Sequence, residues 1–237
     1  MGLIQAEFHR PEIDVFRGAM RFDTSALTGK FEVLQESIMF ITFEGIDGAG
    51  KSTHIKGVVE LLSKNRTVVV TREPGGTETG ELLRRLVLSK PMDLETELLL
   101  MTAARRQHLA EVIEPALAAG HVVVCDRFHD STFAFQGGGR GLPRHRIQEL
   151  DRWLGGKRPD LTFYFDIPVD VAMARIKDTR QLDRFEQEQT DFHQRVRDEY
   201  LSLQACEPQR IVTIDADQGI DAIFNDIKQT LTARGLI

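Results

Sequence analysis

The sequence predicts an α/β protein, a three-layer sandwich in which helices flank a five-stranded parallel sheet. Five short runs rich in Val, Ile and Phe alternate along the chain with longer segments of helical periodicity. Most of the short runs do not alternate apolar with polar residues, which is typical of strands buried on both faces of a parallel sheet. Helical crossovers between such strands cover the two faces of the sheet.

We expect the strands at residues 38–43, 67–71, 122–125, 161–165 and 211–214. We expect the helices at residues 51–64, 77–89, 94–118, 143–154, 168–178, 183–204 and 218–234. Gly120 follows the long third helix, where the positive φ of a glycine ends a helix readily. Ligands of such sheets bind at the carboxyl ends of the strands, so the residues that follow each strand are the candidate site.

Composition limits the classes of function. The 237 residues carry 30 Lys and Arg against 36 Asp and Glu, a net charge of −6 that disfavours a general nucleic-acid binder. No apolar run approaches the ~20 residues that span a bilayer. The two cysteines and the scattered histidines provide neither a disulfide framework nor a zinc site. We therefore expect a cytoplasmic protein that binds neither nucleic acid nor membrane.

The first strand leads into a G-x-x-x-x-G-K-S motif, which reads Gly45-Ile46-Asp47-Gly48-Ala49-Gly50-Lys51-Ser52 and continues into Thr53. Its glycines permit positive φ and bring backbone N–H groups close to an anion. Lys51 offers an ammonium group to the outer phosphates, Ser52 a hydroxyl ligand for Mg²⁺, and the following helix its positive end. A structural turn with an incidental lysine is the alternative, but the strand before the motif and the helix after it favour a nucleoside triphosphate site.

Charged residues also follow the second and third strands. Arg72 and Glu73 precede a turn formed by Pro and paired Gly, and as an isolated pair they could be solvated turn charges. After the third strand, Asp126 can reach the water shell of Mg²⁺ or orient Lys51. Arg127 can donate two parallel hydrogen bonds to a phosphate, although a structural salt bridge is the alternative for these two residues.

Four segments in order read FEGIDGAGKST (43–53), TREPGGT (71–77), DRFHDSTFAFQGGGRG (126–141) and DRFE (183–186). They resemble the motifs of bacterial thymidylate kinases, and the resemblance runs from about Met39 to the C-terminus. It implies a P-loop kinase fold, a homodimer, and an enzyme that transfers the γ-phosphoryl group of ATP to dTMP with Mg²⁺, making dTDP. The acceptor oxygen is already anionic near neutral pH, so catalysis needs positioning and charge neutralisation rather than a general base.

The resemblance assigns roles residue by residue. Residues 45–53 hold the ATP phosphates, with Lys51 on the β and γ oxygens, and Ser52 and Asp126 lie at the Mg²⁺ ion, partly through water. Asp47 bonds the 3′-hydroxyl of the acceptor sugar, and Arg72 and Arg127 clamp the acceptor phosphate. The acceptor pocket is lined by Ser131, Thr132, Phe135 and Gln136. Of these, Phe135 packs against the deoxyribose and disfavours a 2′-hydroxyl.

A lid is expected around residues 175–188. The phosphate loop has no arginine in its variable part, and such loops in this family go with basic residues in the lid. The resemblance implies that Arg180 or Arg184 closes on the transferring phosphoryl group. We expect Arg175 and Lys177 to belong to a solvated helix face.

The third helix departs from the family pattern. The family has a Phe that stacks on thymine, one helical turn before an Arg that bonds the base edge. Here Arg105 or Arg106 can bond the base, but Met101 or Thr102 takes the stacking position, depending on register. Loss of stacking on an aromatic ring costs ~1–3 kcal/mol per base, of which a polarizable Met recovers part. A kinase for dUMP or a modified pyrimidine nucleotide, and more remotely a P-loop switch, therefore stay open as alternatives.

Residues 1–37 mix acidic and basic residues without a sustained period, unlike the chain that follows. We interpret them as an extension outside the catalytic fold, which residues 38–237 form. A chain that lacks residues 1–37 should therefore keep its kinase activity, measured by ADP release under saturating substrates. A truncated protein that is folded by circular dichroism but inactive would contradict this interpretation.

Overall fold

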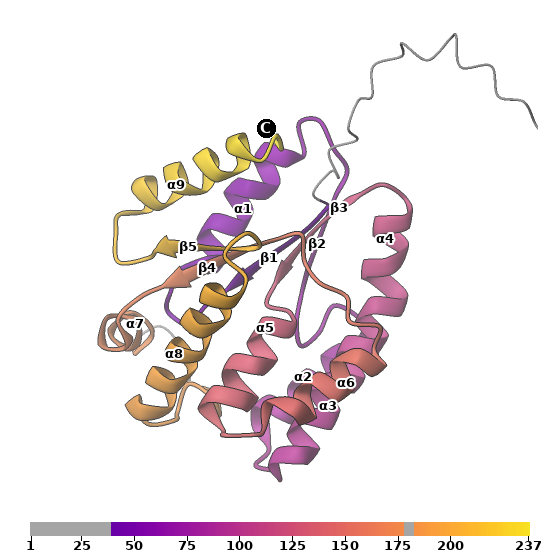
Figure 1. The fold of residues 1–237 in the computed structure, drawn as a ribbon, viewed down its shortest axis with the longest axis vertical. Coiled ribbons are helices and arrows are strands. Elements are labelled where there is room, and N and C mark those ends of the chain that lie inside the picture. Colours follow the sequence, from indigo (N-terminus) through magenta and orange to yellow (C-terminus); the bar gives the residue numbers. More distant parts are fainter. Residues whose placement is uncertain (1–38, 178–182) are drawn as a thin grey trace, which may run out of the picture. The chain divides into compact units, whose positions relative to one another are not determined.

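The computed structural model describes residues 39–177 and 183–237 (Figure 1). Five parallel strands form one sheet in the order β2-β3-β1-β4-β5, which confirms the predicted α/β fold class. The strands are β1 Phe40–Glu44, β2 Val68–Arg72, β3 Val122–Asp126, β4 Leu161–Asp166 and β5 Ile211–Asp215. Each ends one residue later than predicted, so the polar residue at its carboxyl end belongs to the strand.

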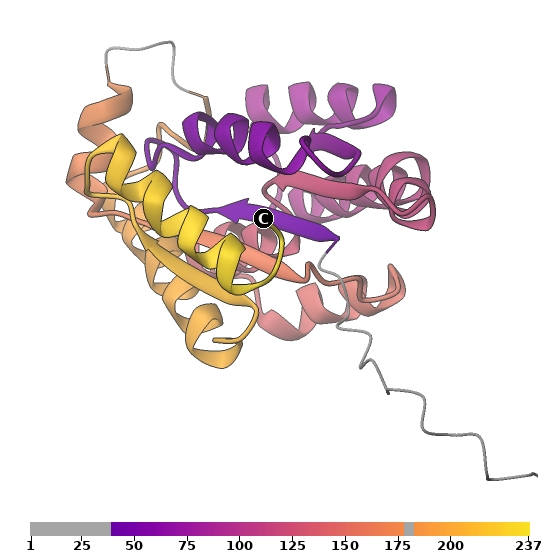
Figure 2. The ribbon, with the colours of Figure 1, turned by 90° about the horizontal axis from the view of Figure 1, so that it is seen from above.

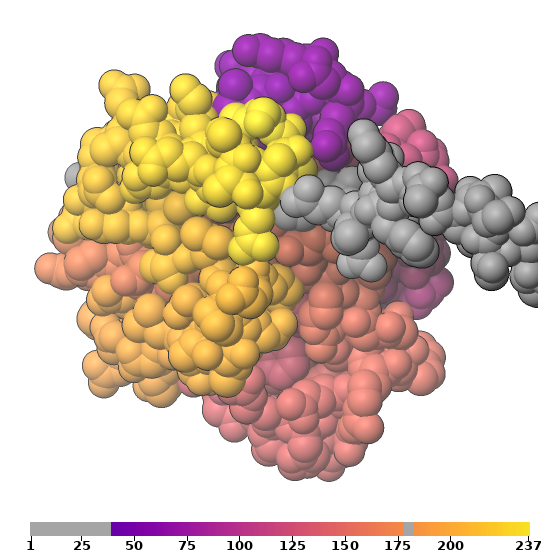
Figure 3. Space-filling view, turned by 45° about the horizontal axis from the view of Figure 1, so that its top comes forward, coloured from indigo at the N-terminus to yellow at the C-terminus, as the bar shows by residue number. Residues whose placement is uncertain are grey.

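Helices cover the sheet on both sides. They are α1 Lys51–Leu62, α2 Glu78–Ser89, α3 Leu94–His108, α4 Glu114–Ala118, α5 His129–Thr132, α6 Arg144–Trp153, α7 Val169–Ile176, α8 Thr190–Cys206 and α9 Ile220–Ala233. In Figure 1, α1 and α9 lie above the sheet, and α5 and α8 lie below it. Figure 2 and the surface in Figure 3 show α1 and α9 side by side, where they pack on each other. None of the helices in the described ranges is long and apolar enough to cross a membrane.

The helices differ from the predictions in three places. The predicted helix 94–118 contains a π-helical segment, Leu109–Ile113, close to Pro115, which has no N–H to bond the carbonyl four residues earlier. A further helix was missed: α5 continues into the π-helical segment Phe133–Gly139, whose three glycines read as a loop. The predicted helix 183–204 begins only at Thr190.

Alternate side chains of the central strand enter different parts of the core. Ile41 and Phe43 of β1 belong to a large apolar cluster that includes residues of α1, α8 and α9. Phe40 belongs to a smaller cluster with Leu109 and Phe128. Because β1 is buried on both faces, it is apolar at most positions, as the sequence indicated.

The strand register gathers polar residues at one edge. Phe43 pairs with Asp126, and Arg72 pairs with the same Asp126 on the other side of β3. The carboxyl ends of β1, β2 and β3 therefore lie next to one another. This is the edge at which parallel sheets bind ligands.

A buried ion network fixes α3 to the segment after β2. Glu73 accepts a 2.7 Å hydrogen bond from Arg105 Nε, and its other oxygen lies 2.9 Å from Nδ1 of His108. Arg105 also donates to the Phe128 carbonyl and to the Thr132 hydroxyl. Burial alone would raise the pKa of Glu73, but the Arg105 and His108 side chains outweigh it and hold the pKa below 4.5. Glu73 thus forms a buried ion pair with Arg105 and is not a solvated turn charge, whereas Arg72 is half exposed and pairs with Glu81.

This network should make stability depend on pH. The depressed pKa means that ionised Glu73 stabilises the fold above pH 4.5, and that this contribution is lost as the pH falls through the lower folded-state pKa. The difference in unfolding free energy between the wild type and Glu73→Gln should therefore narrow below pH 4.5 in urea titrations. Val87→Ala, a non-titrating change at a buried site, is the control, and its effect should stay constant. A Glu73→Gln effect that is equally constant would contradict the prediction.

Candidate active site

The phosphate loop joins β1 to α1 and is held against β4 and α7. Gly45, Gly48 and Gly50 all have positive φ, at 134°, 85° and 87°. A Cβ on Gly45 would lie 2.6 Å from the Phe165 carbonyl oxygen, and one on Gly48 would lie 2.3 Å from that of Ala172. The first two glycines are therefore required both by their backbone conformation and by the lack of space.

Lys51 is folded back onto the loop that precedes it. The side chain is buried, and its Nζ donates to the carbonyls of Gly45 at 2.9 Å and Ile46 at 3.1 Å. Burial lowers the pKa of Lys51, and the nearby Arg127 lowers it further. An anion in the loop would reverse part of this effect, so the ammonium is placed to exchange carbonyl oxygens for phosphate oxygens.

Two adjoining cavities open beside the loop. The phosphate-side cavity is lined by Asp47, Gly48, Gly50, Lys51, Ser52, Thr53, Arg72, Glu73, Arg84, Asp126, Arg127, Arg175 and Ile176. The acceptor-side cavity, with an empty volume of about 620 Å³, is lined by Asp47, Glu73, Pro74, Arg84, Leu88, Met101, Arg105, Arg127, Phe128, Ser131, Thr132, Phe135, Gln136, Asp183 and Phe185. Within these two sets, the shared residues are Asp47, Glu73, Arg84 and Arg127. The shared side chains mark the boundary across which a group would pass from one cavity to the other.

The phosphate-side cavity contains oxygen atoms suited to Mg²⁺. Asp126 Oδ1 is buried without a hydrogen-bond partner among the described residues, and the Ser52 side chain lines the same cavity. Residues 39–177 and 183–237 contain no cluster of three or more His, Cys, Asp or Glu that could hold a metal ion by itself. A hydroxyl and a carboxylate are oxygen ligands of the kind that Mg²⁺ takes alongside waters and phosphate oxygens.

Arg127 lies at the boundary between the cavities. Its backbone has a φ of 68°, which is rare for a residue with a side chain. Its Nη2 donates to Asp47 Oδ1 at 3.0 Å, and its guanidinium lies over the Phe135 ring, 4.8 Å from the centroid. Burial alone would lower the pKa of Arg127, but Asp47 and other acids outweigh it and raise the pKa above its usual value. A permanent cation is thus held at the boundary.

Arg84 is a second shared cation, which the sequence analysis did not identify. Its Nη1 donates to the Pro74 carbonyl at 2.9 Å, so α2 holds it beside the turn after β2. No motif contains it. Helical spacing gives the one available signal, because Glu81, Arg84 and Leu88 share a face of α2, and Glu81 receives the 2.9 Å hydrogen bond of Arg72.

The acceptor-side cavity shows which side chains of α3 face it. Met101 and Arg105 line it, and they are one turn apart. Thr102 instead donates its hydroxyl to the Leu98 carbonyl at 2.7 Å, and the exposed Arg106 lies 3.6 Å from Glu114. The predicted base contacts of Thr102 and Arg106 are therefore not supported, because both side chains lie outside this cavity.

The other predicted acceptor residues meet in the same cavity. The four residues 131, 132, 135 and 136 all line it, and they come from a helical segment for which the sequence analysis predicted no helix. Gln136 Nε2 donates to the buried Glu97 at 2.8 Å, which fixes the direction of its amide. The remaining carbonyl oxygen and the Arg105 guanidinium offer hydrogen-bonding groups to a flat heterocycle.

The lid region differs from the predictions. Arg184 donates to the Val87 carbonyl at 3.0 Å and to Glu97, and it lines neither cavity, so a phosphoryl contact from it is not supported. Arg180 lies outside the described residues. Arg175 is exposed, as expected of a solvated face, but it also lines the phosphate-side cavity and donates to the Ala216 carbonyl at 3.1 Å. Lys177 is exposed, as expected.

Comparison with known proteins agrees with this geometry. Residues 43–227 match the family model described as thymidylate kinase. A thymidylate kinase of Cupriavidus metallidurans is 58% identical over 185 residues, covering 78% of this chain and 92% of the relative. One from Burkholderia vietnamiensis is 55% identical over 200 residues, covering 82% of this chain and 97% of the relative. These matches show that this chain, in which a phosphate loop and an acceptor-side cavity meet at shared cations, belongs to the thymidylate kinase family.

Proposed function

We propose that this protein transfers the γ-phosphoryl group of ATP to dTMP, producing dTDP and ADP, with Mg²⁺ bound at the donor phosphates. The observation that carries the proposal is the boundary between the two cavities, where Arg84 and Arg127 face both. Phosphoryl transfer needs donor and acceptor phosphates in line, with cations that offset their repulsion. A hydrolytic switch has no second phosphate to hold.

On the donor side, backbone N–H groups of the loop and the start of α1 bind the phosphates, and Lys51 contacts the β and γ oxygens. Ser52 and Asp126 would hold Mg²⁺, which would supply positive charge beside the donor phosphates. Gly45 lets the loop lie close to β4, and Gly48 lets it lie close to α7.

On the acceptor side, Arg127 and Arg84 hold the dTMP phosphate, and Arg72 reaches it from the phosphate-side cavity. Asp47 orients Arg127 and accepts a hydrogen bond from the 3′-hydroxyl, while Phe135 packs on the deoxyribose. Arg105 and Gln136 bond the base edge, and Met101 packs on its face. A phosphate oxygen of dTMP attacks the γ-phosphorus as the bond to the ADP oxygen breaks, and no side chain has to remove a proton.

The lid cation stays a sequence-based proposal. Since Arg184 is engaged with α2 and α3, we assign the closing role to Arg180, with Arg175 already beside the loop. The protein is also proposed to be a cytoplasmic homodimer, and the exposed Leu82 and Leu86 of α2 and Leu99 of α3 support an apolar contact surface.

Lys51→Ala and Arg127→Ala should each lower turnover by orders of magnitude, because each removes charge from the developing transition state. The measurement is coupled ADP release with ATP and Mg²⁺, using dTMP, dUMP, UMP and dCMP as acceptors. Lys56→Ala on α1 and Arg152→Ala on α6, both exposed, are the matched controls. Near-normal turnover in either test variant would remove its assigned role, and ADP release that no acceptor stimulates would contradict the kinase assignment.

Met101→Phe should strengthen dTMP binding, because an aromatic ring would stack on the base. A gain of ~1 kcal/mol, the low end for base stacking, would lower KM for dTMP about fivefold. The KM for ATP should stay the same. Ile220→Phe adds the same ring at an exposed position of α9, away from the cavities and from the proposed contact surface, and is the control. An unchanged or higher KM for dTMP would show that Met101 does not lie on the base face.

A further inference from the structure

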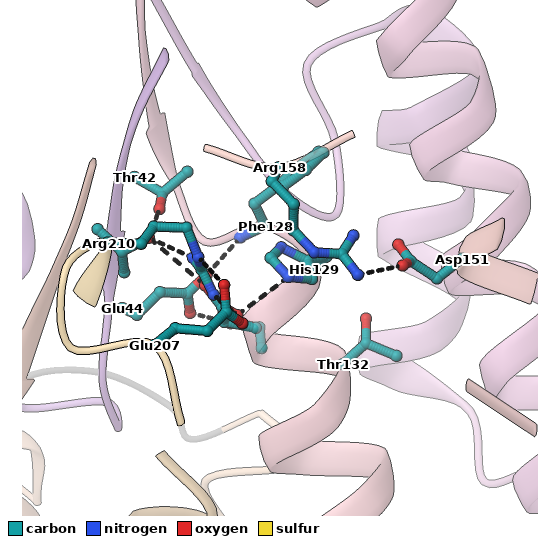
Figure 4. Close-up of polar contacts among 12 residues, drawn as sticks. Thr42, Glu44, Phe128, His129, Thr132, Asp151, Arg158, Glu207 and Arg210 are labelled. Atoms are coloured by element: carbon teal, nitrogen blue, oxygen red, sulfur yellow. Dashed lines mark hydrogen bonds and ion pairs between the residues drawn. The ribbon is translucent and has the colours of Figure 1, made fainter. Parts of the chain in front are cut away.

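Glu44 is a buried carboxylate that the mechanism above does not use. It is the last residue of β1, and its side chain is fully enclosed. Its Oε1 accepts a 2.7 Å hydrogen bond from the Phe128 N–H, drawn in Figure 4. Its Oε2 accepts from Ser131 Oγ at 2.6 Å and from the Tyr200 hydroxyl at 2.7 Å. Burying a carboxylate costs free energy unless hydrogen-bond donors surround it, and three donors surround Glu44.

The two hydroxyls link Glu44 to Arg127. Ser131 Oγ and Tyr200 OH each lie 3.4 Å from Arg127 Nη1, and they lie 2.9 Å from each other. A guanidinium can only donate, whereas a hydroxyl has one proton to give and lone pairs to accept with. A carboxylate only accepts, so Glu44 draws the hydroxyl protons toward itself. The hydroxyl lone pairs are then left facing Arg127.

Burial shifts the pKa of both Tyr200 and Glu44. Burial raises the pKa of the Tyr200 hydroxyl well above its usual value, so Tyr200 keeps its proton and serves as a donor. Burial, together with Asp130, raises the pKa of Glu44 to about 7, against the lowering effect of Ser131, Arg127 and Tyr200. The ionised form therefore depends on the same hydroxyls and on the guanidinium that it serves.

We propose that Glu44 is a positioning residue for the acceptor phosphate, acting on Arg127 through Ser131 and Tyr200. Asp47 accepts a hydrogen bond from Nη2 of Arg127, and the two hydroxyls accept from Nη1. Acceptors on both sides therefore fix the plane of the guanidinium at the cavity boundary. The inference rests on the proposed role of Arg127 as the acceptor clamp.

Asp130 lies next to Ser131 in α5 and has different partners from Glu44. It is also a buried carboxylate, but it pairs with Arg210 through bonds of 2.7 and 2.9 Å. Figure 4 shows Arg210, the residue before β5, with Glu207 beside it. No hydrogen bond or ion pair joins Asp130 to Arg127 within the described residues, so Asp130→Asn is a matched control for loss of a buried charge.

Glu44→Gln tests the proposal with little change of shape. The Phe128 N–H needs an oxygen opposite it, so the new amide NH₂ must face Ser131 and Tyr200. Both hydroxyls then accept from the amide, and their protons turn toward each other and toward Arg127. We expect kcat/KM for dTMP to fall at least about tenfold, mainly through KM, as for loss of a charge-assisted hydrogen bond. The KM for ATP should stay within about twofold.

The controls separate positioning from stability. Asp130→Asn should lower the melting temperature without raising KM for dTMP. Tyr200→Phe keeps the carboxylate and removes one of the two hydroxyl links, so it should raise KM for dTMP in the same direction even if Glu44→Gln does not fold. An equal rise of KM for ATP in Glu44→Gln, or an equal rise of KM for dTMP in Asp130→Asn, would overturn the proposal.

A double-mutant cycle identifies the route. In an Arg127→Lys background, Glu44→Gln should have little further effect on kcat/KM for dTMP, because the oriented guanidinium is already gone. An undiminished effect in that background would overturn the proposal. If Arg127→Lys alone leaves dTMP kinetics unchanged, the clamp role itself is wrong. If Arg127→Lys impairs the enzyme and Glu44→Gln does not, only the inference about Glu44 fails.

Discussion

The backbone hydrogen bonds between β1 and β3 set the position of the functional groups. They place Phe43 beside Asp126, so the phosphate loop that leaves β1 and the Asp-Arg pair that ends β3 emerge at the same edge. A slip of one residue would turn Asp126 to the other face of the sheet and separate it from Ser52. Arg72 depends on the same register, because β2 pairs with β3 and ends opposite Asp126.

Acids organise the cations in and next to this site. Arg127 faces Asp47, Arg105 faces Glu73, and Arg184 faces Glu97. Each acid offsets the cost of enclosing a positive group, and each lets the guanidinium point in one direction. Phosphoryl transfer benefits from such fixed charges, because they need not reorganise when charge develops on the reacting oxygens.

Most of the fold and part of the site could be predicted from the sequence. Apolar runs located the five strands, and the glycines, Lys51 and Ser52 located the phosphate loop, because their spacing is required by close contact with an anion. Local periodicity did not reveal the helix at residues 129–139, since glycines at its end mask the pattern. It also left the register of α3 open between adjacent residues, which only the packing of the helix decides.

The remaining misses share one physical cause. Arg84 lies on a helix with no motif, and the contact of Arg184 with Glu97, 87 residues away in the chain, could not be predicted from the lid motif. Pairing between distant charges depends on tertiary structure, which a motif does not report. Glu44 was read as part of the loop motif, and its role as an acceptor for Ser131 and Tyr200 required the positions of α5 and α8.

The shared boundary between the cavities has a consequence for equilibrium binding. A phosphate that enters from either side meets the same Arg84 and Arg127, and it alters the charge that the second phosphate encounters. The two ligands are therefore linked by a coupling free energy, and linkage is reciprocal: whatever factor ATP imposes on the dissociation constant of dTMP, dTMP imposes on that of ATP.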